Sequence, residues 1–219
     1  ESGINGLTGE LNVLNILDND SLNGSLVDPT VVTLTQTTTN PQLILNTDGS
    51  VDVLSGTPEG NYSIEYQICE NLNPDNCSSA TVTISVESSP IVAVNDVESG
   101  INGLTGETGI LNVLDNDSLN GSLVDPTVVT LTQTTTNPQL ILNTDGSVDV
   151  LSGTPEGDYS IEYQICENLN PDNCSSATVT ISVESSPIVA VNDLESGING
   201  LTGELNVLNI LDNDSLNGS

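Results

Sequence analysis

The sequence predicts an all-β protein built of tandem β-sandwiches, and three observations support this fold class. Hydrophobic residues make up 35% of the 219 residues, and most are Val, Ile and Leu, which favour strands. Short apolar stretches are separated by Thr, Ser, Asn, Gly and Pro, as expected of strands joined by turns. The chain also repeats itself every 97 residues, which is the size of one sandwich domain rather than of a short solenoid unit.

The copies of this repeat are nearly identical. Residues 1–97 and 98–194 differ at six of 97 positions, and a third copy occupies residues 195–219. The differences are Leu11/Thr108, Asn12/Gly109, Val13/Ile110, Ile16/Val113, Asn61/Asp158 and Val97/Leu194. Near-identity indicates a function that adds up along the chain, such as length, spacing or multivalency, rather than one unique site.

Linkers divide the chain at Ser88-Ser89-Pro90 and again at Ser185-Ser186-Pro187, because Ser and Pro interrupt strands. We therefore expect three domains: residues 1–87 as a repeat that lacks its first strand, residues 91–184 as a complete repeat, and residues 188–219 as the start of a third. On this interpretation the chain is a section of a longer array.

Seven strands are expected in the complete repeat, joined by turns that include the hairpin signal Asp145-Gly146. Seven strands in about 95 residues is the count of an immunoglobulin-like (Ig-like) Greek-key sandwich of two sheets. The expected strands are residues 91–94, 110–113, 128–133, 140–142, 147–151, 159–165 and 177–183.

Tyr159 follows Gly157-Asp158 at the point where the chain of such a sandwich crosses from one sheet to the other. It is a candidate for a tyrosine corner, in which the hydroxyl bonds to the main chain a few residues upstream. The alternative is a buried tyrosine whose hydroxyl reaches the rim of the core.

The charge balance excludes several classes of function. The chain has 31 acidic residues and no Lys, Arg or His, so its formal net charge is −31. Binding to nucleic acid phosphates needs basic side chains, and anionic membrane surfaces would repel this chain. No apolar stretch approaches the roughly 20 residues of a membrane span. We expect neither nucleic acid binding nor membrane insertion.

Catalysis is also not expected. Histidine-based triads and Schiff-base lysines cannot be built from this composition, which leaves only carboxylate-pair chemistry of the glycosidase type. Near-identical repeats with only four aromatic residues, all Tyr, make a sugar-cleaving site improbable. The sequence therefore predicts a protein that is not an enzyme.

Each full copy contains two cysteines eight positions apart, Cys69 and Cys77 in the first and Cys166 and Cys174 in the second. An Asn-Pro-Asp turn lies between them, so a disulfide within each repeat is expected. The alternatives are metal-bound thiolates or free thiols, but two Cys without His cannot fill a tetrahedral zinc site within a copy. Disulfides indicate an oxidising compartment.

A calcium site is expected where Asp and Asn cluster, because Ca²⁺ prefers hard oxygen ligands. The Leu-Asp-Asn-Asp motif occurs three times, and Asn-Asp follows each linker. The alternative is that these residues only shape turns. The candidate metal ligands are Asp18, Asn19, Asp20, Asp96, Asp115, Asn116, Asp117, Asp193, Asp212 and Asp214.

Two segments carry a resemblance to known proteins. Residues 155–183, from Pro-Glu-Gly-Asp-Tyr to Thr-Ile-Ser-Val, resemble the C-terminal half of tandem Ig-like repeats in very large secreted surface proteins of Bacteroidota. Asn-Val-Leu-Asp-Asn-Asp at 112–117 is similar to the Val-Leu-Ala-Asn-Asp-Thr-like signature of bacterial cadherin-like and VCBS-type adhesin repeats.

This resemblance implies export to the bacterial cell surface and a role as an adhesin stalk or surface filament that extends and spaces a distal binding region. It also implies O-glycosylation of Ser21, Ser118 and Ser215, each within Asp-Ser-Leu. The expected partners are neighbouring repeats of the same chain, with lateral self-association into filaments as a further contact. The alternative function is a multivalent adhesive module that binds cations, glycans or ice.

Overall fold

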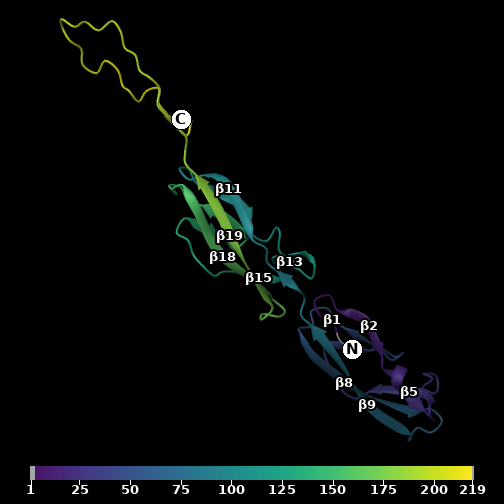
Figure 1. Ribbon diagram of the computed structural model, residues 1–219. Coiled ribbons are helices and arrows are strands. Elements are labelled where there is room, and N and C mark those ends of the chain that lie inside the picture. Colours follow the sequence, from purple (N-terminus) through teal and green to yellow (C-terminus); the bar gives the residue numbers. More distant parts are fainter. Residues whose placement is uncertain (1–2, 219) are drawn as a thin grey trace. The chain divides into compact units, whose positions relative to one another are not determined.

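The computed structural model describes residues 3–218, and these residues are almost entirely β-structure (Figure 1). The helical element in this part of the chain is a short 3₁₀ turn, η1 (Ile16–Asn19), capped by the Asn15 side chain. Tandem β-sandwiches are therefore the fold class, as the composition and the repeat predict. Within residues 3–218, no helix is both long enough and apolar enough to span a membrane.

The second repeat contains two sheets. The four-stranded sheet has the order β11 (Asp96–Asn102), β19 (Cys174–Glu184), β18 (Gly157–Glu167) and β15 (Val129–Gln133), and the three-stranded sheet has the order β12 (Glu107–Asn112), β17 (Ser147–Val150) and β16 (Leu140–Leu142). Strand β11 runs parallel to β19 with Asp96 opposite Val179, and β17 pairs in antiparallel fashion with both β12 and β16.

The first repeat has the same order of strands. Its four-stranded sheet contains a parallel β1–β9 pair in which Ile4 lies opposite Val86. This sheet has the order β1 (Ile4–Asn5), β9 (Cys77–Glu87), β8 (Gly60–Glu70) and β5 (Val32–Gln36), and the second sheet has the order β2 (Glu10–Asn15), β7 (Ser50–Val53) and β6 (Leu43–Leu45). Among the strands of these two sheets, the chain changes sheet from β1 to β2, from β2 to β5, from β5 to β6 and from β7 to β8, which is consistent with the expected Greek-key sandwich.

Short two-residue strands extend these sandwiches. In the second repeat, β13 (Ser118–Leu119) and β14 (Ser122–Leu123) form a hairpin over Asn120 and Gly121, both at positive φ as a type I′ turn requires. Strand β10 (Ile91–Val92) pairs with the free side of β13. The corresponding pairs are β3 (Ser21–Leu22) with β4 (Ser25–Leu26), and β20 (Ile188–Val189) with β21 (Ser215–Leu216).

The core of each repeat comes from the alternation of side chains along the long strands. Strand β8 buries Ile64 and Tyr66, and β9 buries Val82, Ile84 and Val86, while the intervening residues are more exposed. The second repeat buries the equivalent residues Ile161, Tyr163, Val179, Ile181 and Val183. Period-two alternation over eleven residues is the expected pattern for strands with one buried face.

The structure corrects the expected first strand of the complete repeat. The pattern at 91–94 predicts one strand, but β10 covers only residues 91–92 and the main first strand is β11, which begins at Asp96. Asn95-Asp96 looks like a turn in the sequence, and Gly100 at φ +79° interrupts the register of β11. The other six expected strands are present, and β18 and β19 are longer than expected because both extend to the cysteines.

Tyr159 behaves as a tyrosine corner. Its hydroxyl donates a hydrogen bond of 2.9 Å to the carbonyl oxygen of Pro155, four residues earlier, and the side chain is half-buried. Tyr62 donates the same bond to Pro58 in the first repeat. The geometry favours the corner over the alternative of a buried tyrosine whose hydroxyl reaches the rim of the core.

The chain divides into two compact units that cut across the sequence repeats. One contains the described residues up to Ala93 together with Leu114–Thr132 and Gln164–Ser176, and the other contains Val94–Val113, Gln133–Tyr163 and the described residues from Ala177 onward. The domain boundaries expected from the linkers stay a prediction.

Candidate repeat-junction site

A disulfide closes the hairpin between the two longest strands of each repeat. Cys69 is bonded to Cys77, and Cys166 to Cys174, with an S–S distance of 2.05 Å and a Cα–Cα distance of 4.1 Å in both. All four cysteines are used, so both expected disulfides are present and no thiol is free. The closed loop of the second repeat, between Cys166 and Cys174, contains Asn170 and Asn173.

The buried Glu167 side chain holds the loop of the second repeat through hydrogen bonds. It is only 1% exposed, and its Oε2 atom accepts hydrogen bonds from Asn170 Nδ2 at 3.0 Å and from Asn173 Nδ2 at 2.8 Å. Its Oε1 atom is buried without a hydrogen-bond partner. Leaving such an atom unpaired costs stability, so the hairpin must be held in place by its other contacts.

The equivalent Glu70 in the first repeat is only half-buried. Asn76 donates from Nδ2 to Glu70 Oε2 at 2.9 Å. The hydrogen bond from Asn76, followed by one from Asn73, holds the pKa of Glu70 below its ordinary value. The same loop is therefore formed in both copies, and the deeper burial of Glu167 comes from what lies against the second loop.

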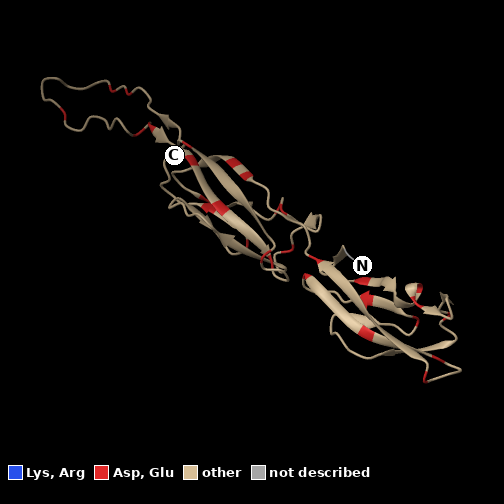
Figure 2. Ribbon diagram, turned by 60° about the horizontal axis from the view of Figure 1, so that its bottom comes forward, with Lys and Arg blue, Asp and Glu red and all other residues tan. Residues whose placement is uncertain are grey.

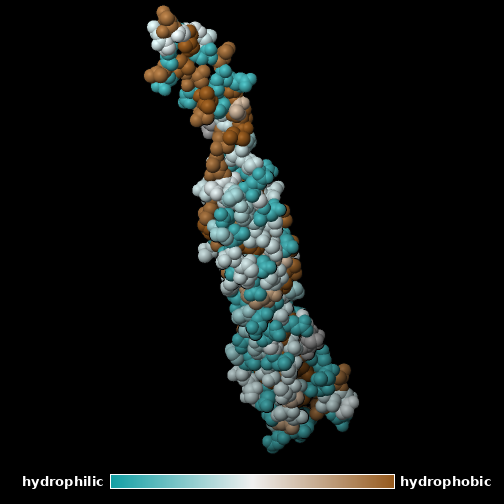
Figure 3. Space-filling view, turned by 60° about the vertical axis from the view of Figure 1, so that its left-hand side comes forward, coloured by the Kyte–Doolittle hydropathy of each residue, from teal (hydrophilic) through white to brown (hydrophobic). Residues whose placement is uncertain are grey.

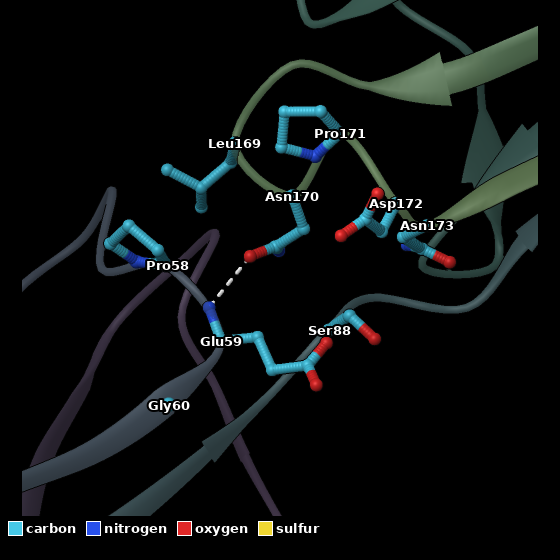
Figure 4. A pocket seen from close by; sticks show the side chains of 9 residues that line it. All are labelled: Pro58, Glu59, Gly60, Ser88, Leu169, Asn170, Pro171, Asp172 and Asn173. Carbon is cyan, nitrogen blue, oxygen red and sulfur yellow. Dashed lines mark hydrogen bonds between the residues drawn. The ribbon is translucent and has the colours of Figure 1, made fainter.

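What lies against the second loop is the end of the first repeat. The main-chain NH of Glu59 donates a hydrogen bond of 2.6 Å to Asn170 Oδ1, and Asn173 Nδ2 donates one of 2.6 Å to the carbonyl oxygen of Ser89. Figure 4 shows the Asn170 amide pointing to the Glu59 NH. All four residues lie in the same compact unit.

A hollow of about 640 Å³ surrounds this contact. Figure 4 shows it between the Pro58–Gly60 turn and the hairpin loop, with the Glu59 side chain extending toward Ser88. The lining residues are Pro58, Glu59, Gly60, Ser88, Leu169, Asn170, Pro171, Asp172 and Asn173. Segments from both repeats thus line the hollow.

The contact is made by neutral amides although the chain is strongly acidic. Figure 2 shows acidic residues, in red, along the ribbon of both repeats and no basic ones, as the sequence requires. Ion pairs are therefore excluded as a means of joining repeats. Asn side chains and main-chain groups form hydrogen bonds without bringing carboxylates together, and such bonds are less sensitive to salt than ion pairs.

The expected calcium ligands do not come together as a metal centre. Within residues 3–218, no three Asp, Glu or Cys side chains converge in a group that could hold a metal ion. In the first copy, Asp18 and Asn19 are exposed in η1, while Asp20 accepts hydrogen bonds from the Tyr66 hydroxyl at 3.0 and 3.1 Å. The Asp20 carboxylate thus has a structural role that competes with metal binding.

In the other copies the candidate ligands differ in burial. Asp115 and Asn116 are exposed whereas Asp117 is fully buried, and Asp96 is also buried at the start of β11. In the third copy Asp193, Asp212 and Asn213 are exposed, and Asp214 accepts a hydrogen bond from the Val191 NH at 2.8 Å. Calcium binding by these residues stays a prediction.

The serines expected to carry glycans occupy the short strands. Ser21 is exposed in β3, whereas Ser118 in β13 and Ser215 in β21 are half-buried. Their modification stays a prediction. In the first repeat the exposed Ser21 leaves most room for a glycan.

The sequence analysis missed the junction residues themselves. Asn170 and Asn173 belong to an Asn-Pro-Asp-Asn stretch that reads as a turn, and Glu59 belongs to a Pro-Glu-Gly turn. One feature of the sequence could have pointed to these residues. A linker as short as Ser88-Ser89-Pro90 brings the turns at the ends of neighbouring repeats close together.

Comparisons with known proteins give structural likeness only. No protein-family model matches the chain, and no curated protein matches it. The chain is similar to N-cadherin EC1-3 of Drosophila (12% identity, TM-score 0.48, 84% of this chain and 62% of that chain) and to chicken VE-cadherin EC1-2 (14% identity, TM-score 0.36, 84% and 95%). It also matches an endo-fucoidan hydrolase of glycoside hydrolase family 107 (19% identity, TM-score 0.29, 70% and 24%). The chain thus spans less than two thirds of the N-cadherin structure, and likeness of this degree assigns no function.

Proposed function

We propose that this chain is part of a structural repeat array that extends and spaces a distal binding region outside the cell, as the stalk of a bacterial surface adhesin or as a surface filament. The observation that carries the proposal is the hydrogen bond between Glu59 and Asn170, which joins one repeat to the disulfide-closed hairpin of the next. A stalk needs such contacts because a linker alone leaves the distance between its ends undefined.

The near-identity of the copies supports this role. Every residue of the junction recurs in the other copy: Glu59 as Glu156, Ser89 as Ser186, and the hairpin asparagines as Asn73 and Asn76. A junction that can be repeated with the same side chains allows an array to grow by adding copies, since each repeat carries both halves of the contact.

The chemistry of the chain supports a location outside the cell. Disulfides persist in oxidising compartments, and both full repeats contain one. The absence of Lys and Arg from the sequence removes every cleavage site for trypsin-like proteases, which suits an exposed fibre. We assign no catalytic role.

The test is the distance distribution between the two repeats. All native cysteines are in disulfides, so new cysteines at Thr35 and Thr132, both exposed, can be labelled selectively with spin labels. Pulsed electron paramagnetic resonance of the full chain should give a narrow distribution. Asn170→Ala should broaden it, because the acceptor for the Glu59 NH is lost.

Asn73→Ala is the matched control. Asn73 occupies the same place in the first hairpin and bonds to Glu70, as Asn170 bonds to Glu167. It should leave the distribution narrow, because only Asn170 bonds to Glu59. A broad distribution for the parent chain, or equal broadening by both substitutions, would contradict a stalk whose repeats are held by this junction.

A further inference from the structure

Strand β5 forms one edge of the four-stranded sheet of the first repeat. Its antiparallel register with β8 is regular over five residues. The Thr37 NH donates a hydrogen bond of 2.9 Å to the Glu65 carbonyl oxygen, which shows that the odd-numbered residues here bond to β8. The main-chain NH and carbonyl groups of Val32, Leu34 and Gln36 therefore point away from β8, toward the outside of the sheet.

The same edge recurs in the second repeat. Strand β15 has the same Val-Thr-Leu-Thr-Gln sequence as β5 and the same place at the end of its sheet. Among residues 3–218, β18 is the one strand that pairs with β15, and β8 is the one that pairs with β5. The described residues continue beyond the second repeat in both directions, and none of them covers the outer side of β15.

The edge strand of the other sheet is protected, whereas β5 is not. Strand β2 carries Glu10, and a bulge between Glu10 and Leu14, with Asn12 at φ 54°, interrupts its register with β7. Strand β12 likewise carries Glu107 and a bulge. Charges, prolines and bulges discourage an edge strand from pairing with another chain. Strand β5 has no charge, no proline and no bulge, so its edge is suited to pairing.

The charge distribution favours a second copy of this chain as the partner. Each copy carries a net charge of −31, so two copies can meet closely only where carboxylates are absent. The longest uncharged stretches of the sequence are residues 29–47, which contain β5, and residues 126–144, which contain β15. A partner rich in basic side chains would instead be attracted to the acidic parts of the surface.

The type of contact follows from the surface. Figure 3 shows mostly hydrophilic and weakly polar residues, in teal and white, on the side of both repeats that is in view, with hydrophobic residues in small patches. A broad apolar interface is not offered by this side. Main-chain hydrogen bonds at a strand edge supply affinity without one.

We propose that β5 and β15 are edges for self-association, at which two copies of this chain pair in antiparallel fashion, β5 with β5 and β15 with β15, and so join their four-stranded sheets. In a β5 pair centred on Leu34, Val32 lies opposite Gln36 of the second copy, and Thr33 lies opposite Thr35. The outward NH and carbonyl groups of residues 32, 34 and 36 then all form hydrogen bonds. The two half-buried Leu34 side chains meet across the pair.

The carboxylates nearest to this contact stay apart. Glu70 lies opposite Val32 on β8, and Glu65 bonds through its main chain to Thr37. From the spacing of strands, the closest carboxylates of two paired copies are about 14 Å or more apart, which exceeds the Debye length of about 8 Å at physiological ionic strength. Each molecule has two such edges, so association can continue from pairs into lateral bundles.

Spin labels test the pairing. A label on Thr35→Cys would lie about 8 Å from the same label on the paired copy, whereas a label on Thr81→Cys, in β9, would lie more than about 24 Å from its counterpart. Both positions are exposed, and all native cysteines are in disulfides. The resonance of the full chain labelled at Thr35→Cys should broaden as protein concentration rises, in salt that screens repulsion between copies.

Mixing with unlabelled chain should reverse this broadening, and Thr81→Cys is the control that should not broaden. Equal broadening at both positions would show non-specific aggregation and overturn the proposal. The inference does not rest on the Glu59–Asn170 contact of the proposed stalk, so the two proposals can fail separately.

Proline at the edge gives a second test by sedimentation velocity. Gln36→Pro with Gln133→Pro removes an outward NH from each edge and leaves the bonds to β8 and β18 in place. Association should weaken roughly tenfold or more, because each contact loses two main-chain hydrogen bonds.

Gln36→Ala with Gln133→Ala is the matched control for the proline variant. It loses the same side-chain bonds, to the carbonyl oxygens of Thr38 and Thr135, but keeps the NH groups, so association should change little. Equal weakening by the proline and alanine variants would overturn the proposal. A parent chain that stays monomeric at every salt and protein concentration would do the same, and the spin-label comparison does not depend on the folding of the proline variant.

Discussion

The main-chain NH of Glu59 donates a hydrogen bond of 2.6 Å to the Oδ1 atom of Asn170, although 111 positions separate the two residues. The donor lies at the turn before β8 of the first repeat, and the acceptor lies in a loop closed by the Cys166–Cys174 disulfide. Because that loop is short, the covalent closure limits where the Asn170 amide can point. The disulfide therefore acts on the junction as well as on the stability of its own repeat.

Replacing Cys166 and Cys174 by Ser should lower the free energy of unfolding of the second repeat by about 2–3 kcal/mol, the range for a short closed loop. It should also speed hydrogen exchange at the Glu59 amide, since the acceptor loop gains freedom. Chemical denaturation measures the first effect, and hydrogen exchange with peptide-level mass spectrometry measures the second.

The matched control replaces Cys69 and Cys77 by Ser. The Cys69–Cys77 disulfide closes the equivalent loop of the first repeat, whose Asn73 does not bond to Glu59. This variant should lose similar stability with no change in local exchange at Glu59. Faster exchange of the same size in both variants would show that the disulfide does not position Asn170.

The fold could be predicted from the sequence because its evidence is local and periodic. Alternation at Tyr159, Ile161, Tyr163 and Ile165 predicts β18, and the structure buries Ile161, Tyr163 and Ile165 while leaving Tyr159 half-buried. The β13–β14 hairpin was missed although Asn120-Gly121 is a strong turn signal, because only two residues on each side pair.

The junction could not be predicted, because its evidence is not local. Asn170 looks like any turn residue, and what distinguishes it is a partner in another repeat. The calcium motif shows a similar limit of sequence reasoning: the sequence places the carboxylates close together, but in the structure Asp115 is exposed while Asp117 is buried. The sequence carries the residue types, and only the fold decides which of them meet.

The buried tyrosine of the first repeat should make the protein sensitive to alkali. Burial, followed by the hydrogen bond to Asp20 and its negative charge, raises the pKa of Tyr66 to about 12. The folded state thus keeps this proton at pH values where the unfolded chain, with a pKa of about 10, releases it. The contribution of Tyr66 to stability is complete below about pH 10 and is lost as the pH rises through about 12.

Asp20→Asn separates the causes of this shift. The amide removes the charge but still offers an oxygen to the Tyr66 hydroxyl, so the pKa of Tyr66 should fall only part of the way toward its ordinary value. The near-ultraviolet absorbance of tyrosinate measures this during alkaline titration. A return to the ordinary value would show that Asp20, rather than burial, is the main cause.

Two aspartates in hairpin turns should make the folded state less stable as the pH falls, whereas the contribution of Tyr66 is lost as the pH rises. The Ser147 hydroxyl and then the Ser147 NH bond to Asp145 and hold its pKa below 3.8, and Ser50 does the same for Asp48. Because the folded-state pKa values are depressed, this contribution to stability is present above the ordinary pKa of about 3.9 and is lost as the pH falls through the lowered values.

Ser147→Ala isolates this contribution, since it removes the hydroxyl that is the largest cause. The pKa of Asp145 should rise, as measured by NMR titration of the side-chain carboxyl, and the difference in unfolding free energy from the parent chain should shrink as the pH falls below about 4. The variant has to be compared with the parent because protonation at low pH also relieves repulsion among the 31 acidic residues. This relief stabilises the folded state of both proteins, opposite to the effect of protonating Asp145. A difference that is constant with pH would contradict the assignment.

The close approach at Gly103 gives the most severe substitution we expect. A Cβ atom there would lie 1.9 Å from the carbonyl oxygen of Thr154 and 2.7 Å from Val183 Cγ1. The Gly103 carbonyl also accepts hydrogen bonds from the NH groups of Gly153 and Thr154, so the two segments cannot separate without breaking them. Gly103→Ala should therefore destabilise the second repeat by at least about 3 kcal/mol or prevent its folding.

Gly100→Asn is the control for Gly103→Ala, measured by thermal unfolding of both full-length variants. Gly100 has φ +79°, but a Cβ atom there would meet nothing within 4 Å, and Asn tolerates positive φ better than most residues. It should cost no more than about 1 kcal/mol. If Gly103→Ala were equally mild, the contact with Thr154 would have to relax far more easily than two hydrogen-bonded main-chain segments allow.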